Sequence, residues 1–137
     1  MIRVDYARFG LYSKPLGAAV PGPFTSVSLQ YGGRHYDTLG LIDSGADTTI
    51  FHTQWALAFR LPLDPAKSES GGGIGGGIRI WRHKIHLIAL GERIEADVGF
   101  TDGCPKEFGL LGRADFFLAF NLGFDQKSSR FLFSKRA

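Results

Sequence analysis

Residues 41–49 run Leu41-Ile42-Asp43-Ser44-Gly45-Ala46-Asp47-Thr48-Thr49, and they decide how the rest of the chain is interpreted. Two apolar residues lead into a carboxylate, and a Ser-Gly pair follows it at once. This order is typical of a buried strand that ends in a tight turn and carries Asp43 into a site. Gly45 permits the sharp turn, and the hydroxyl of Ser44 can hydrogen-bond to it. An ordinary strand-to-turn junction fits the same residues, so this stretch alone does not establish a site.

Outward from this stretch, apolar and polar residues alternate. Residues 25–31 alternate strictly, Gly32-Gly33 offers a tight turn, and residues 36–42 return as a second strand. A second hairpin is predicted from residues 78–90 and 94–100, which a glycine turn joins. Alternation with a period of two is the pattern of strands with one buried face, so the chain is predicted to be mostly β.

Helical signals are few. A short helix is predicted over residues 53–59 with Thr53 as its N-cap, and a second over residues 114–121. Residues 122–133 predict a strand, a turn and another strand. At the other end of the chain, the alternation over residues 2–6 predicts an edge strand.

A run of glycines interrupted by Ile74 occupies residues 71–77, after a predicted polar loop over residues 64–70. The run fits either a flexible linker or the tip of a hairpin, and its flanks favour the hairpin tip. Its glycines also satisfy the dinucleotide-binding pattern, but a strand follows where that motif requires a helix. Further on, residues 109–117 predict an apolar strand that ends in Gly-Arg and runs into the second helix.

Length and composition narrow the classes of protein. The chain has 137 residues, 44% of them hydrophobic, and a net charge of +3, which suits one domain with a sizeable core. Scattered basic residues predict no nucleic-acid partner, and the longest apolar stretch, residues 116–124, is too short to span a membrane. A single cysteine, Cys104, and no signal-peptide pattern predict a cytoplasmic protein. His83 and His86 would point to opposite faces of one strand, so no metal site is expected.

Taken in order, these stretches resemble the retroviral-type aspartic proteases, or retropepsins. Residues 23–50 resemble the opening hairpin and active-site loop of that family, residues 72–80 its flap, and Leu110-Leu111-Gly112-Arg113 the strand before its C-terminal helix. The resemblance implies an all-β, closed retropepsin-like fold with a flap hairpin and one or two short helices, completed as a symmetric homodimer. It assigns residues 23–137 to the protease domain. Residues 1–22 are then an N-terminal extension that serves as a strand, a pro-segment or a dimer arm.

The resemblance also implies a role for each matching residue. Asp43 is the catalytic acid and base, and Ser44 and Gly45 lock the two active-site loops together. Asp47 meets the backbone amides of the substrate and pairs with Arg113. The expected substrate contacts are Thr48, Ile50, Gly73, Ile74, Gly75, Phe108 and Leu110. For Ile50 and the last two of these, a plain core position is the alternative.

Acid proteases of this type need two aspartates, and the chain has one Asp-Ser-Gly. The second is therefore expected to be Asp43 of another copy, across the axis of a homodimer. Two carboxylates held close together cannot both ionise cheaply, so one keeps a proton while the other activates a shared water. No metal or organic cofactor is required. The expected substrate is a peptide or protein with hydrophobic residues around the cut, and the expected pH optimum is on the acid side of neutral.

Two other functions remain open from the sequence. One is a dimeric peptide-binding or scaffolding module of the same fold that is catalytically weak or silent. An intact Asp43-Ser44-Gly45 beside an intact flap argues against it, because a scaffold has no chemical need for either. The other is a nucleotide binder built on the glycine run, which would be retained on a nucleotide resin.

Overall fold

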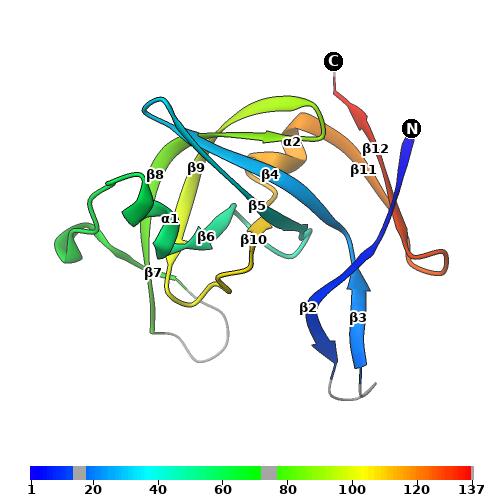
Figure 1. The fold of residues 1–137 in the computed structure, drawn as a ribbon, viewed down its shortest axis with the longest axis horizontal. Coiled ribbons are helices and arrows are strands. Elements are labelled where there is room, and N and C mark those ends of the chain that lie inside the picture. The colour runs from blue at the N-terminus through cyan, green and yellow to red at the C-terminus, as the bar shows by residue number, and fades with distance from the viewer. Residues whose placement is uncertain (14–17, 72–76, 137) are drawn as a thin grey trace.

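The computed structural model describes residues 1–13, 18–71 and 77–136, and Figure 1 shows their arrangement. The tip of the expected flap, residues 73–75, lies outside the described residues.

Seven strands form the main sheet, in the order β4-β5-β10-β6-β9-β8-β7. An additional pairing between β4 and β8 closes the sheet on itself. The strands are β4 (Phe24–Tyr31), β5 (Arg34–Ile42), β6 (Ile50–His52), β7 (Glu69–Gly71), β8 (Ile78–Ala89), β9 (Glu92–Thr101) and β10 (Phe108–Leu111). The prediction of an all-β fold is confirmed.

Two tight turns build the long hairpins β4–β5 and β8–β9. Gly32 and Gly33 have φ angles of 58° and 77°, and Leu90 and Gly91 have φ angles of 51° and 79°. Two successive residues with positive φ match the right-handed twist of the paired strands, and glycine adopts this conformation without strain. Both hairpins lie where the alternation predicts them.

A second sheet of three strands lies apart from the main sheet, in the order β1 (Ile2–Asp5), β12 (Arg130–Lys135) and β11 (Phe120–Asp125) (Figure 1). β1 pairs antiparallel with β12, which places Val4 opposite Phe131. The N-terminal segment is thus an edge strand, as predicted, and it is built into the C-terminal sheet. A separate hairpin of β2 (Ala7–Ser13) and β3 (Ala18–Gly22) follows it, which the sequence did not predict.

The hydrophobic core joins the two sheets. Leu29, Phe51 and Phe100 of the main sheet, Phe116 of α2 (Phe116–Ala119) and Phe131 of β12 are fully buried and belong to one cluster. Buried aromatic side chains remove a large apolar area from water, so this cluster fixes the sheets relative to each other.

The helices differ from the prediction in their ends. Helix α1 (Thr53–Ala58) is present, but its N-cap is His52, whose Nδ1 accepts from the backbone N–H of Gln54 at 3.0 Å. The predicted second helix is wrong beyond Ala119, because Phe120 begins β11 and pairs with Lys135 of β12. The hydrogen bonds of the sheet here replace those of a longer helix.

The predicted loop over residues 64–70 contains structure as well. A 3₁₀ turn, η1 (Pro65–Lys67), follows Asp64, whose side chain accepts from the N–H of Ala66 at 3.0 Å. Strand β7 comes next and pairs with the start of β8, so that Glu69 lies opposite Ile80. The loop prediction was therefore wrong for residues 69 and 70.

Candidate active site

Asp43 follows β5 at the point where β5 and β10 run parallel. Leu41 lies opposite Leu110, and Ile42 lies opposite Leu111. The N–H of Asp43 donates to the carbonyl of Leu111 at 3.1 Å, which extends the pairing by one residue. Because Ile42 and Leu111 are buried, the two strands form a rigid base for the carboxylate.

The turn after Asp43 holds its side chain. The N–H of Gly45 donates to Oδ1 of Asp43 at 2.8 Å, and the N–H of Ala46 donates to the Asp43 carbonyl at 3.1 Å. A Cβ on Gly45 would lie 3.2 Å from the same Oδ1, so the absence of a side chain there favours the close approach. Asp43 is half-buried, while Ser44 and Gly45 are exposed. One carboxylate oxygen is therefore held by the backbone at the mouth of the turn.

Asp47 and Arg113 join this loop to the segment after β10. The guanidinium of Arg113 donates to Oδ1 of Asp47, and both side chains are mostly exposed. Two backbone bonds reinforce the contact, from Arg113 to the Ala46 carbonyl at 3.0 Å and from Ala114 to the Asp47 carbonyl at 2.9 Å. The structure thus brings together the two residues whose pairing the resemblance implies.

Beneath this contact the two loops cross closely. The buried hydroxyl of Thr49 accepts from the N–H of Gly112 at 3.1 Å and donates to the carboxylate of Asp115. A Cβ on Gly112 would lie 2.7 Å from Cα of Thr48, so no side chain fits at the crossing. Sequence reasoning assigned no role to Thr49 or Asp115. The only signal was a hydroxyl residue placed two positions after Asp47.

A cleft of about 480 Å³ opens beside the Asp43 loop. Of the residues predicted for the site, it is lined by Asp43, Gly45, Asp47, Thr48, Ile50 and Leu110. Phe108 does not line it. Its side chain is buried and packs edge-on against Phe24, with ring centroids 5.1 Å apart. Ser44 does not line the cleft either, and Gly73, Ile74 and Gly75 lie outside the described residues.

Most of the remaining lining comes from residues outside the predicted substrate contacts, although Ile78 and Ile80 belong to the segment that resembles the flap. These lining residues are Glu69 and Ser70 of β7, Ile78, Ile80 and Arg82 of β8, and Thr101, Gly103, Cys104 and Pro105 at the end of β9 and just after it. The sequence signal for the last group was a Gly-Cys-Pro turn between two apolar strands. Such a turn predicts an exposed loop, but not that the loop faces Asp43.

The carboxylates that line the cleft differ in whether they have an ion-pair partner. Asp47 pairs with Arg113, and Glu69 pairs with Nε of Arg82 at 2.5 Å. Within residues 1–13, 18–71 and 77–136, Asp43 is the cleft carboxylate without an ion-pair partner. A carboxylate that is held in place but not neutralised by a cation is suited to proton transfer.

The model of a known family, described as aspartyl protease, matches residues 27–114. This segment contains the Asp43 loop, the strands that carry it and the ion pair to Arg113. The chain belongs to the aspartyl protease family. The predicted relationship to the retropepsin-like aspartic proteases is thereby confirmed. A comparison with curated proteins found no match.

The single cysteine of the chain lines the cleft but is not poised for nucleophilic chemistry. Cys104 is 7% exposed, and its thiol donates to the Phe108 carbonyl at 3.5 Å. Burial raises the pKa of the Cys104 thiol to about 12. The thiol is therefore neutral near pH 7, and a neutral thiol is a poor nucleophile.

Two further observations concern the described residues. Their histidine, cysteine and acidic side chains form no group of three or more that could hold a metal ion. None of their helices is long and apolar enough to cross a membrane.

Proposed function

We propose that the chain is an aspartic endopeptidase that acts as a homodimer. The observation that carries this proposal is Asp43 itself. The turn fixes one of its carboxylate oxygens, the rigid β5–β10 pair supports it, and it lies at a cleft without an ion-pair partner in the described residues. One such group supplies half of a catalytic pair, so Asp43 of the partner subunit supplies the other half across a two-fold axis.

The chemistry follows from two carboxylates that share one proton. The ionised Asp43 accepts a proton from a water held between the two groups, and the oxygen of that water attacks the peptide carbonyl carbon. The protonated partner donates to the carbonyl oxygen, which stabilises the developing negative charge. The C–N bond then breaks as the amine nitrogen takes up a proton. This balance of protons predicts highest activity on the acid side of neutral.

The cleft supports a preference for hydrophobic side chains around the cut. Four apolar residues line it, namely Ile50, Leu110, Ile78 and Ile80. Asp47 also lines the cleft and its side chain is exposed, so its carboxylate can accept from the backbone amides of an extended peptide. Backbone hydrogen bonds then provide affinity, and the apolar walls provide selectivity.

The test is mass spectrometry of a complex peptide mixture incubated with micromolar protein at mildly acid pH. Wild type is run beside Asp43→Asn, and the dimeric state of both samples is established first. New peptide ends in wild type alone would establish the protease and report its side-chain preference. Identical peptide lists from two dimeric samples would overturn the proposal and favour a silent peptide-binding module.

A further inference from the structure

The segment between β9 and β10, residues 102–107, forms part of one cleft wall, and we call it the wall loop. Gly103, Cys104 and Pro105 of this loop line the cleft. The loop also meets the first residue of β8. A Cβ on Gly103 would lie 3.1 Å from Cδ1 of Ile78, so the two segments are already in close contact. A shift of the wall loop would therefore change the width of the cleft between Asp43 and β8.

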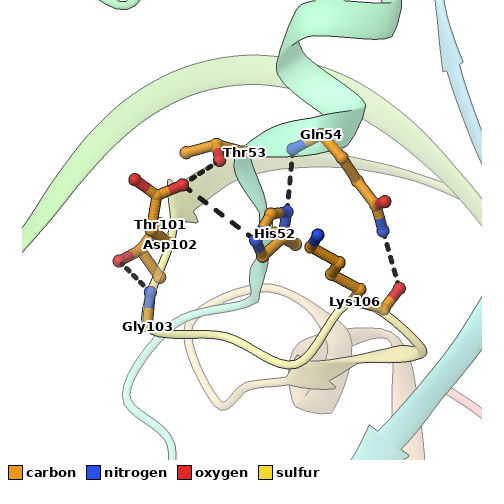
Figure 2. Close-up of polar contacts among 7 residues, drawn as sticks. All are labelled: His52, Thr53, Gln54, Thr101, Asp102, Gly103 and Lys106. Atoms are coloured by element: carbon orange, nitrogen blue, oxygen red, sulfur yellow. Dashed lines mark hydrogen bonds and ion pairs between the residues drawn. The ribbon is translucent and has the colours of Figure 1, made fainter.

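Three consecutive residues at the start of α1 fasten the wall loop. Figure 2 shows His52 and Thr53 reaching the carboxylate of Asp102 at the loop's first position. The hydroxyl of Thr53 donates to Oδ1 of Asp102, and Nε2 of His52 lies 4.0 Å from the same oxygen. Because Nδ1 of His52 accepts from the N–H of Gln54, a neutral imidazole carries its proton on Nε2, the nitrogen that faces Asp102.

The third fastening lies near the other end of the wall loop. Nε2 of Gln54 donates to the carbonyl of Lys106 at 2.7 Å (Figure 2). Asp102 and Lys106 bracket the three residues that line the cleft, so the loop is held on both sides of them. At the start of the loop, the N–H of Gly103 donates to the hydroxyl of Thr101, the last residue of β9, at 3.1 Å.

The start of α1 is more deeply buried than Asp102 of the wall loop that it holds. Thr53 is 4% exposed and Ala56, on the same helix, is fully buried in the core, whereas the side chain of Asp102 is 80% exposed. The wall loop is exposed except at Cys104, and where it is fastened to the buried helix start it takes its position from the helix. The start of α1 therefore fixes the position of the wall loop, and through it the width of the cleft.

We propose that Thr53 and Gln54, with His52, are positioning residues that place the wall loop and thereby set which side chains the cleft accepts. This inference rests on the proposed function, since it concerns the peptide that the cleft binds. None of the three residues lines the cleft, and the wall loop does not carry Asp43. Their replacement is thus expected to change substrate binding more than the chemical step.

The test compares Thr53→Val with Thr53→Ser. Valine keeps the shape of the side chain and removes the donor to Asp102, while serine keeps the donor. Gln54→Met removes the second fastening in the same way. Ile94→Val, a core change near the start of β9 and away from the wall loop, controls for a general loss of stability.

Two readouts are taken on the full chain under dimeric conditions. Amide hydrogen exchange of residues 102–107 is expected to accelerate in Thr53→Val and Gln54→Met, and to stay near wild type in Thr53→Ser and Ile94→Val. For the best peptide, KM is expected to rise about fivefold in the first two variants with kcat within about twofold. The set of accepted side chains is expected to broaden in parallel.

The outcomes separate this inference from the proposed function. Unchanged exchange in the wall loop, or faster exchange with an unchanged peptide profile, would overturn the inference even if wild type cuts peptides. If wild type cuts nothing, the protease proposal fails. The peptide profile is then the set of peptides in the mixture that stay bound to the protein. The same comparison of retained peptides then supports or overturns the positioning role.

Discussion

At the scale of single residues, the Asp43 loop and the segment after β10 leave no room for a side chain where they cross. A Cβ on Gly112 would lie 2.7 Å from Cα of Thr48, and the atoms that it meets are backbone, which cannot turn aside. We expect Gly112→Ala to lower the free energy of unfolding by about 3 kcal/mol, because overpacking displaces the Asp43 loop. Denaturant titration measures the change.

A matched control for that change lies in β11. A Cβ on Gly123 would have its nearest neighbour at 3.9 Å, an ordinary contact with Leu132. Gly123→Ala should leave the free energy of unfolding unchanged or raise it by up to about 1 kcal/mol, since alanine loses less conformational freedom on folding. Equal losses in the two variants would contradict the crossing argument.

Burial of the Cys104 thiol makes the free energy of unfolding depend on pH in the alkaline range. Its folded pKa of about 12 lies above the ordinary value of an unfolded thiol, about 8.5. As pH rises past that ordinary value, the unfolded chain releases a proton that the folded chain keeps. The free energy of unfolding therefore falls with rising pH from this group, and the effect is complete near the folded pKa.

The measurement is denaturant titration of wild type and Cys104→Ala at about pH 7.5 and about pH 10. Wild type should lose roughly 1–2 kcal/mol more than the variant between these two values. The comparison cancels the other groups that titrate in this range. Parallel losses in the two proteins would show that the thiol is not protected by burial.

Single residues also show which features of the candidate site a sequence pattern predicts and which it does not. Asp43, Gly45 and Asp47 lie together at the cleft because their spacing along one loop brings them there. Phe108, also predicted to contact substrate, packs against Phe24 in the interior. An apolar residue on a strand faces either a pocket or the core, and alternation alone does not distinguish the two.

At the scale of elements, the N-cap of helix α1 is His52, which is not among the residues usually found at that position. Serine, threonine, aspartate and asparagine are the usual N-caps, so Thr53 was the expected one. In the structure Nδ1 of His52 accepts from the N–H of Gln54, and the hydroxyl of Thr53 donates to Asp102 instead of capping the helix. The tertiary contact with Asp102 explains why the sequence pattern missed the position by one residue.

This arrangement predicts losses of different size for two changes at His52. His52→Ala should lower the free energy of unfolding by about 1 kcal/mol, because the first turn of α1 loses its cap. His52→Asn should recover most of that loss, since asparagine is among the best N-caps. Thermal and denaturant unfolding of the two variants decide the matter, and equal losses would show that His52 stabilises the fold by other contacts.

The remaining element errors share a physical cause. Residues 69 and 70 carry polar side chains typical of a loop, yet they pair with β8 as strand β7. Residues 120 and 121 continue a helical pattern but join β12 instead. In both places hydrogen bonds to a strand distant in the sequence outweigh local preference, and local pattern contains no information about that partner.

At the scale of the whole molecule, the C-terminal sheet limits how two copies can meet. β12 lies between β1 and β11 of its own chain. Its backbone groups are therefore paired on both sides, and the edges available to a partner are those of β1 and β11. The sheet's outer face presents Leu132 flanked by Arg3 and Gly123, with Arg130 between Asp5 and Asp125 in the next row.

A dimer that shares one active site predicts a specific result of mixing. When wild type and Asp43→Asn exchange subunits at equal concentrations, about a quarter of the dimers contain two wild-type chains. Activity should therefore fall to about half of the value for the same wild-type protein alone, rather than staying unchanged, because half of the wild-type chains enter mixed dimers. Mixing with Leu57→Ala, an exposed change on α1, should not reduce activity. Undiminished activity after complete exchange would mean that one Asp43 suffices, and the paired-carboxylate mechanism would then be wrong.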